Sequence, residues 1–198
     1  ALEDGFLRAV GIGESGATSL SLIVDDLGVY YDATRPSRLE QLIATAPDWC
    51  DEAMRGRARG LIDRIVASGV SKTNMGGPLD PRLLKPGRRV LIVDQTFGDA
   101  SIGYGLASEQ SFSDMLATAR REEPDAQLIV KRHPAVAAGR KQGCIPADQL
   151  GGVTLIDTDV RPADLLAAVD AVYVVTSALG FEALLRGLCG FAHGLVAR

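Results

Sequence analysis

The feature that most constrains the fold is an alternation of apolar runs with helical patterns between residues 89 and 187. The runs "RVLIVDQ" and "AQLIVKRHP" flank "SEQSFSDMLATARREEP", and the runs "GVTLIDTD" and "AVYVVTS" flank "RPADLLAAVD", with "ALGFEALLRG" after the last run. Short apolar strands interleaved with helices are typical of a parallel sheet that is covered on both faces. We therefore predict a Rossmann-like α/β lobe. Its four strands are fewer than the usual about five or six, so we expect the lobe to be incomplete at its C-terminus.

The N-terminal third has a different pattern. We predict a strand near residues 7–12, followed by a β-hairpin in "SLSLIVDDLGVYYD" whose turn is Asp-Asp-Leu-Gly. Ser37 and Glu40 have the spacing of a capping box and predict a helix in "SRLEQLIATA". A second helix is expected from Pro47 or Asp48 to Gly69. The segment 71–89 is rich in glycine and proline, and we place the boundary there, dividing the chain into residues 1–75 and residues 76–198.

Composition excludes several classes of protein. The chain of 198 residues has a formal net charge of -4, with 46% hydrophobic and 23% charged residues, which is ordinary for a soluble globular protein. The acidic balance gives no general attraction to nucleic acid, so any anion site must be local. Three cysteines and two histidines are too few and too dispersed for a disulfide framework or a zinc site. We expect a cytoplasmic protein with structural thiols, without a metal centre, signal peptide or membrane span.

Polar clusters follow three of the predicted strands. The carboxyl ends of parallel strands meet at one edge of a sheet, where open α/β proteins bind ligands. "DQTFGDAS" contains Gln95 and Asp99, and "VKRHPAVAAGRK" contains cations and a His-Pro step. In "VTSALGFEAL" a hydroxyl pair precedes a helix, whose free amides would add to an anion site. The candidate nucleotide or phosphate ligands are Lys131, His133, Pro134, Thr176, Ser177, Gln95, Lys141 and Glu182.

Each cluster also has an ordinary structural interpretation. Thr176 and Ser177 could be helix N-caps, His133 a turn residue, Asp99 the start of an Asx turn, and the Arg140 and Lys141 pair a solvated helix face. The convergence of three clusters on one sheet edge favours a phosphate or nucleotide site. The chain has no P-loop, no Gly-x-Gly-x-x-Gly in register and no Gly-x-Ser-x-Gly, which argues against common NTPases, nicotinamide enzymes and serine hydrolases.

The start of the chain carries two adjacent carboxylates, Glu3 and Asp4, before Gly5. A glycine permits close backbone approach, so one of these acids could lie in a cleft between the two lobes. Acidic-Gly turns are common, however, and from these residues alone a solvated turn is the favoured interpretation.

Five segments together resemble the KpsC-type capsule polysaccharide biosynthesis proteins: "EDGFLRAVGIG", "SLIVDDLGVYYDATRPSRLE", "VLIVDQTFGDASIGYGLAS", "VKRHPAVAAGRKQG" and "VTSALGFEALLRG". The resemblance implies a GT-B-like architecture of two Rossmann-like lobes. Residues 76–198 would be the donor lobe for a nucleotide sugar, and residues 1–75, a β-hairpin and two helices, would be the remnant of the acceptor lobe. It further implies a retaining Kdo transferase that moves Kdo from CMP-Kdo to a glycolipid acceptor.

The same resemblance assigns roles to residues. The acidic-acidic-Gly motif falls on Glu3, Asp4 and Gly5, and the nucleotide phosphate motifs fall on the His133-Pro134 step and on the Thr176-Ser177 pair. Retention by double displacement requires a carboxylate nucleophile, for which Asp4 is the first candidate and Asp99 its competitor. No metal or cofactor is implied, since side chains would neutralise the departing phosphate.

The chain also departs from the family pattern. The acidic motif begins at residue 3, and "LCGFAHGLVAR" replaces the expected continuation after "FEALLRG", so we expect an internal fragment or truncated copy. The expected partners are CMP-Kdo, a glycolipid acceptor and capsule assembly proteins, with peripheral contact at the inner membrane. Two alternatives stay open: a non-catalytic accessory protein of capsule biosynthesis or export, and a nucleotide-sugar epimerase of GT-B shape.

Overall fold

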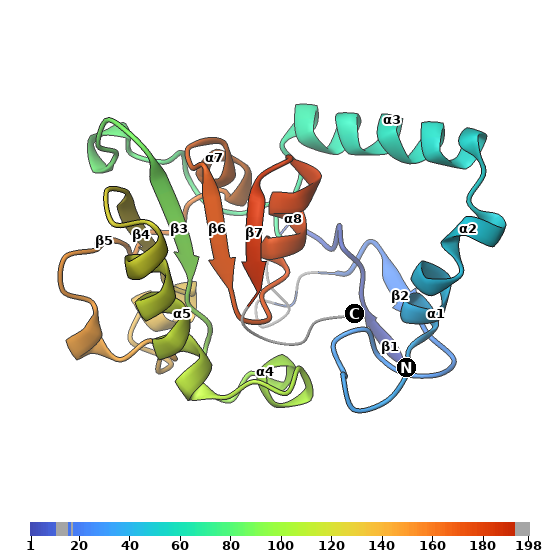
Figure 1. The fold of residues 1–198 in the computed structure, drawn as a ribbon, viewed down its shortest axis with the longest axis horizontal. Coiled ribbons are helices and arrows are strands. Elements are labelled where there is room, and N and C mark those ends of the chain that lie inside the picture. Colours follow the sequence, from blue (N-terminus) through green and yellow to red (C-terminus); the bar gives the residue numbers. More distant parts are fainter. Residues whose placement is uncertain (11–15, 17, 193–198) are drawn as a thin grey trace.

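A computed structural model describes residues 1–10, 16 and 18–192 of the chain (Figure 1). The N-terminal region contains β1 (Leu2–Asp4), β2 (Leu22–Val24), α1 (Arg38–Ala44), α2 (Ala46–Trp49) and α3 (Glu52–Ser68). The C-terminal region contains β3 (Arg89–Val93), α4 (Ala100–Tyr104), α5 (Glu109–Glu122), β4 (Gln127–Lys131), α6 (Pro134–Ala137), β5 (Thr154–Ile156), α7 (Pro162–Ala167), β6 (Ala171–Val174), α8 (Leu179–Leu185) and β7 (Cys189–Ala192). Short 3-10 turns lie at Pro81–Leu83 and Ala147–Gln149.

A five-stranded parallel sheet in the order β5-β4-β3-β6-β7 forms the centre of the fold. Alternate residues of β3 point to opposite faces of the sheet, because side chains alternate along a strand. Val90 and Ile92 belong to a core with α5 side chains such as Phe112, whereas Leu91 and Val93 belong to a second core with α7 and α8. The predicted α/β class with a parallel sheet is therefore confirmed.

The sheet has one strand more than the four predicted. β7 pairs in parallel with β6 at the edge of the sheet, and the Phe191 ring stacks on Tyr173 with centroids 4.5 Å apart. Its sequence, "CGFA", is short and interrupted by a glycine, so it lacks the apolar periodicity that marks the other strands. The count of four strands was wrong for that reason.

The predicted hairpin in residues 19–32 is also wrong. β2 pairs antiparallel with β1, so that Glu3 lies opposite Ile23, and the segment beyond the turn forms no strand. Asp25 is the cause: its carboxylate accepts from the backbone N–H groups of Leu27 and Gly28 and from those of Arg38 and Leu39 in α1. These bonds direct the chain toward α1 instead of back along β2.

A strand was likewise expected near residues 7–12. The structure has only an isolated bridge between Ala9 and Thr73 in this region, and residues 11 and 12 lie outside the described residues.

The helices of the N-terminal region follow their capping signals. The capping box at α1 is present, with the Ser37 hydroxyl accepting from the Glu40 N–H at 3.1 Å and the Glu40 carboxylate accepting from the Ser37 N–H at 2.8 Å. The second helix ends at Gly69 as predicted, in the left-handed conformation with φ of 66°. Its start is wrong, because the chain breaks after α2 and Asp51 caps a new helix by accepting from the Met54 N–H.

The two regions of the chain meet at the carboxyl end of the sheet. Figure 1 shows β1, β2 and α1 beside α8 and β7, whereas α3 extends away from the sheet. Phe6 packs against Phe181 of α8 with ring centroids 4.6 Å apart, and Ser71 donates to the buried carboxylate of Glu182. Among the described residues, no helix is both long and apolar enough to cross a membrane.

Candidate functional site

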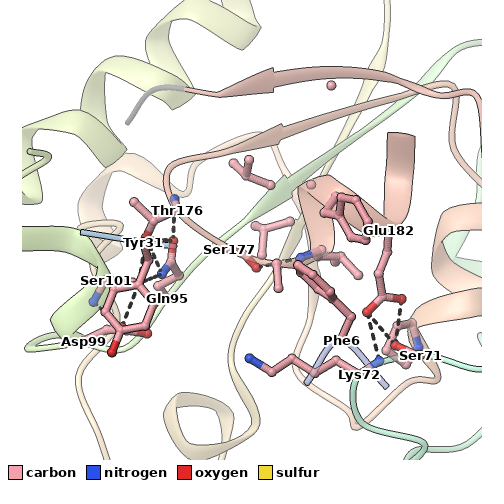
Figure 2. A pocket seen from close by; sticks show the side chains of 18 of the residues that line it. Phe6, Tyr31, Ser71, Lys72, Gln95, Asp99, Ser101, Thr176, Ser177 and Glu182 are labelled. Atoms are coloured by element: carbon pink, nitrogen blue, oxygen red, sulfur yellow. Dashed lines mark hydrogen bonds between the residues drawn. The ribbon is translucent and has the colours of Figure 1, made fainter. Parts of the chain in front are cut away.

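A cavity of about 850 Å³ lies at the carboxyl ends of the parallel strands, and the N-terminal region closes one side of it (Figure 2). Most of the predicted site residues line this cavity, namely Glu3, Gln95, Asp99, Lys131, His133, Thr176, Ser177 and Glu182. Asp4 and Lys141 are not among its lining residues. The three strand ends and one of the two N-terminal acids therefore face a common space.

A hydrogen-bond network joins the ends of β3 and β6 to α4 (Figure 2). The Gln95 amide donates to the Thr176 hydroxyl at 2.9 Å, and its oxygen accepts from the Thr176 N–H at 3.0 Å. The Ser101 hydroxyl lies 2.9 Å from the Thr176 hydroxyl and donates to the Asp99 carboxylate at 2.8 Å. These bonds join Gln95 to Thr176 directly and Asp99 to Thr176 through Ser101, and they fix the part of the cavity wall that the two strand ends and α4 form.

The hydroxyl pair is not the N-cap of α8. That position is held by Ala178, which makes no side-chain capping bond. The N-cap interpretation is therefore wrong for Thr176, whose hydroxyl bonds with Gln95 and Ser101. Ser177 also lines the cavity, and its hydroxyl accepts a 3.3 Å hydrogen bond from the N–H of Leu179, the first residue of α8.

Lys131 is the last residue of β4, the neighbour of β3 in the sheet, and His133 follows directly after this strand end. The Lys131 ammonium donates to the Thr158 carbonyl at 2.9 Å. Burial lowers the pKa of Lys131, and the nearby carboxylates of Asp159 and Asp157 act against that shift. The His133 Nδ1 atom accepts from the Ala135 N–H at 3.1 Å. In the neutral ring this bond assigns the proton to Nε2.

The loop that follows the His-Pro step is held in place by Asp94. Its carboxylate is buried and accepts from the N–H groups of Gln95, Cys144 and Ile145 at 2.9 to 3.0 Å. Burial raises the pKa of Asp94, while these backbone N–H groups and the charge of Arg132 oppose the shift. Asp94 therefore has a structural role at the cavity wall.

Lys141 lies in this loop but outside the cavity. Its side chain is exposed, and its backbone N–H donates to the Ala135 carbonyl at 3.1 Å. The adjacent Arg140 is exposed too. This position agrees with the solvated-surface interpretation of the pair and not with a phosphate ligand. Pro134 is the first residue of α6.

The two N-terminal acids diverge because consecutive residues of a strand face opposite sides. Glu3 lines the cavity, where its carboxylate accepts from the Tyr31 hydroxyl at 3.1 Å and from the Asp4 N–H. The Asp4 carboxylate forms an ion pair with Arg8. The structure thus puts Glu3, and not Asp4, on the cavity surface.

Glu182 is 8% exposed and does not have the surroundings of a phosphate ligand. Its carboxylate accepts from the Ser71 hydroxyl at 2.8 and 2.7 Å and from the Lys72 N–H at 3.1 Å. These bonds tie α8 to the segment between the two regions of the chain. A carboxylate would also repel a phosphate at short range.

Sequence reasoning missed several cavity residues. Phe6, Tyr30, Tyr31 and Phe181 form an aromatic wall, in which Phe6 lies 5.7 Å from Tyr30 between ring centroids and Tyr30 lies 5.3 Å from Tyr31. Burial raises the pKa of Tyr30 to about 12, with a further contribution from the nearby Glu3 carboxylate. Lys72 was missed as well. The sequence does show the adjacent tyrosines Tyr30 and Tyr31, but the hairpin prediction places them in a strand.

The described residues contain no group of three or more His, Cys, Asp or Glu side chains that could hold a metal ion. The cavity is lined by hydroxyl, amide, imidazole, ammonium and guanidinium groups, which are donors suited to an anionic ligand, and also by the carboxylates of Glu3, Asp94, Asp99 and Glu182.

The parallel sheet and the cavity at its carboxyl edge define a Rossmann-like α/β protein, a class that binds ligands at this edge. The family model described as "Capsule polysaccharide biosynthesis protein" matches residues 1–62 and 52–196. The chain belongs to this family.

Known relatives and solved structures agree with the family. Over 192 residues, 94% of this chain, it is 48% identical to the capsule polysaccharide modification protein LipA of Neisseria meningitidis serogroup A. It is 42% identical to the lipopolysaccharide-processing protein LpsZ of Rhizobium meliloti over 188 residues, 93% of this chain. The chain spans only 27% of the length of LipA and 43% of the length of LpsZ.

Two structures of KpsC from Thermosulfurimonas dismutans superpose on the chain. The one described as a beta Kdo 2,4 transferase has a TM-score of 0.89 and 42% identity, covering 98% of this chain and 61% of that chain. The one described as a beta Kdo 2,7 transferase has a TM-score of 0.70 and 27% identity, covering 98% and 57%. The expected resemblance to KpsC-type proteins is therefore confirmed.

Proposed function

We propose that the chain is the donor-binding region of a glycosyltransferase of capsular polysaccharide biosynthesis, which transfers Kdo from CMP-Kdo to a glycolipid acceptor with retention. The observation that carries the proposal is the cavity, where amide, imidazole, ammonium and hydroxyl groups of three parallel strand ends line the same space as the carboxylate of Glu3. The likeness to the Kdo transferases supports the identity of the sugar.

The chemistry needs stabilisation of a leaving group. Transfer of Kdo breaks the bond between its anomeric carbon and the CMP phosphate, and negative charge develops on that phosphate. In the proposal His133 donates its Nε2 proton in a hydrogen bond to the phosphate, and Ser177 and Lys131 supply further donors. The bond that His133 Nδ1 accepts from Ala135 orients the ring for this role. No metal or cofactor takes part.

Retention by double displacement assigns the nucleophile to a carboxylate. The resemblance favours Asp4, whereas the cavity geometry favours Glu3, since Asp4 pairs with Arg8. Asp99 stays the competitor, since it also lines the cavity and only its Oδ1 atom accepts from the N–H and the hydroxyl of Ser101. We propose that one member of the Glu3 and Asp4 pair is the nucleophile. Loss of transfer in only Glu3→Gln or only Asp4→Asn would identify it.

The proposed function also implies a location, partner proteins and a role for each region of the chain. We place the reaction on the cytoplasmic side of the inner membrane, with peripheral contact to the membrane and to capsule assembly proteins. Residues 1–75 act in the proposal as the acceptor-lobe remnant, and residues 76–198 act as the donor lobe.

Calorimetric titration of CMP into the 198-residue chain, with UMP as control, tests the proposal. CMP is expected to bind selectively, and His133→Ala or Ser177→Ala is expected to weaken binding by about 1 to 3 kcal/mol through lost hydrogen bonds to a charged group. Lys141→Ala is the matched control, since this cation lies outside the cavity, and its affinity for CMP should equal that of the parent chain.

The alternatives make different predictions in the same titration. A folded chain that binds no CMP would refute the proposal. The alternative that the chain is a non-catalytic accessory protein of capsule biosynthesis or export would then be favoured. A preference for UMP would favour the epimerase. Equal CMP affinities of the parent, His133→Ala and Ser177→Ala would refute the site assignment alone.

A further inference from the structure

The segment Ser71 to Asn74 is held rigidly where the two regions of the chain meet. The Lys72 N–H donates to Glu182, and the Lys72 carbonyl accepts from the N–H groups of Arg8 and Ala9 at 3.1 and 3.3 Å. Asn74 donates to the Ala9 carbonyl from both its backbone and its side chain. The backbone of Lys72 is thus fixed on two sides, although this residue lies in a loop.

The side chain of Lys72 is the unexplained group in this arrangement. It lines the cavity and is partly buried, and in Figure 2 it runs out from the loop beside Phe6. Two other cations of the cavity have partners: Arg132 pairs with Asp157, and Lys131 donates to the Thr158 carbonyl. Within the described residues of the chain, the Lys72 ammonium has neither an ion pair nor a hydrogen bond. A partly buried cation without a partner favours an anionic ligand.

The surroundings of Lys72 narrow the class of ligand. Phe6 and Phe181 line the same cavity with tilted rings, and both offer apolar surface. An apolar wall beside a single cation suits a ligand with one negative group and a body that carries C–H faces. A second phosphate would instead require several donors around it.

We propose that Lys72 pairs with the carboxylate of an acidic sugar that packs against Phe6 and Phe181. The identity of the sugar rests on the proposed function, since Kdo is a 2-keto sugar acid with one carboxylate. That carboxylate comes either from the sugar of the donor or from the terminal sugar of the acceptor, and the chemistry of recognition is the same. Lys72 then selects acidic sugars over neutral ones, while the strand ends bind the nucleotide.

Titration of the 198-residue chain with CMP-Kdo, with a Kdo disaccharide and with CMP tests this assignment. Lys72→Met keeps the length of the side chain and removes its charge, Lys72→Arg keeps the charge, and Lys85→Met removes an exposed cation elsewhere as the matched control. Lys72→Met is expected to bind at least one of the two acidic sugar ligands about tenfold more weakly, with CMP affinity within twofold of the parent. Lys72→Arg should retain most of the affinity, and Lys85→Met all of it.

The two arms of the titration identify the source of the carboxylate. A loss confined to CMP-Kdo indicates the donor sugar, and a loss confined to the disaccharide indicates the acceptor. Equal affinities of parent and Lys72→Met for both ligands overturn the proposal, as does a parent chain that binds neither sugar. If the loss is confined to the disaccharide, the methyl ester of the disaccharide should bind the parent chain as weakly as the free acid binds Lys72→Met. Absence of CMP binding would instead refute the proposed nucleotide site, independently of the Lys72 result.

Discussion

Replacement of Glu182 by alanine should destabilise the chain strongly, because this buried carboxylate joins α8 to the segment between the two regions. It accepts hydrogen bonds from the Ser71 hydroxyl and the Lys72 N–H. A hydrogen bond to a charged group contributes roughly 1.5 to 3 kcal/mol, so two such bonds give about 3 to 6 kcal/mol. Removal of the buried charge offsets part of this loss. We expect the free energy of unfolding to fall by about 3 kcal/mol.

The assay is urea denaturation followed by circular dichroism, with Ser71→Ala and the double variant completing a mutant cycle. Ser71→Ala should cost about 1.5 kcal/mol, since one of the two bonds is lost. The double variant should cost less than the sum, because Ser71 and Glu182 lose the same interaction. Glu109→Gln removes an exposed carboxylate and should stay within about 0.5 kcal/mol of the parent. A Glu182→Ala loss below about 1 kcal/mol, or strict additivity in the cycle, would refute the reasoning.

Two further predictions concern the N-terminal turn and the glycines of the connecting segment. Burial acts to raise the pKa of Asp25. The hydrogen bonds that its carboxylate accepts from backbone N–H groups, first that of Gly28, act against burial and hold the pKa below 3.8. The stabilisation from this carboxylate is therefore present above pH 3.8 and is lost as the pH falls through the depressed pKa. The difference in melting temperature between parent and Asp25→Asn should thus shrink as the pH falls below 3.8, and a constant difference would contradict the prediction. Gly76 and Gly87 both have φ of 96°, but a Cβ atom at Gly76 would meet the Val160 carbonyl carbon at 2.7 Å, whereas one at Gly87 meets nothing within 4 Å. Gly76→Ala should therefore cost about 1 to 3 kcal/mol more than Gly87→Ala in urea denaturation, and equal costs would show that the loop yields.

Local patterns predicted those elements of the fold that local forces determine. The apolar runs became β3 to β6, and the Ser37 and Glu40 capping box began α1, because periodicity and capping act within a few residues. The pairing of β1 with β2 could not be predicted in this way. It joins two segments that are distant in the chain, and the turn after β2 is held by bonds that Asp25 accepts from Arg38 and Leu39, 13 and 14 residues further on.

The candidate site shows the same division. Strand-end position predicted that Gln95, His133 and Ser177 would share a cavity, because parallel strands end at one edge of the sheet. Lys72 and Phe6 belong to segments without strand periodicity. Lys72 is held at the cavity by its bonds with Arg8 and Glu182, and Phe6 is held there by its packing on Phe181. Such contacts between distant segments leave no signal in the spacing of residues.

Polar residues at a strand end therefore indicate where a site lies more reliably than what each residue does in it. Thr176 and Glu182 look like ligand groups in the sequence, yet their partners are Gln95 and Ser71 within the protein. These satisfied groups fix the strand ends and α8, and a fixed frame lowers the cost of ordering the groups that meet a ligand. Substitution in the frame should thus weaken every ligand of the cavity together, whereas substitution of a single ligand group such as Lys72 should weaken one ligand and spare the others.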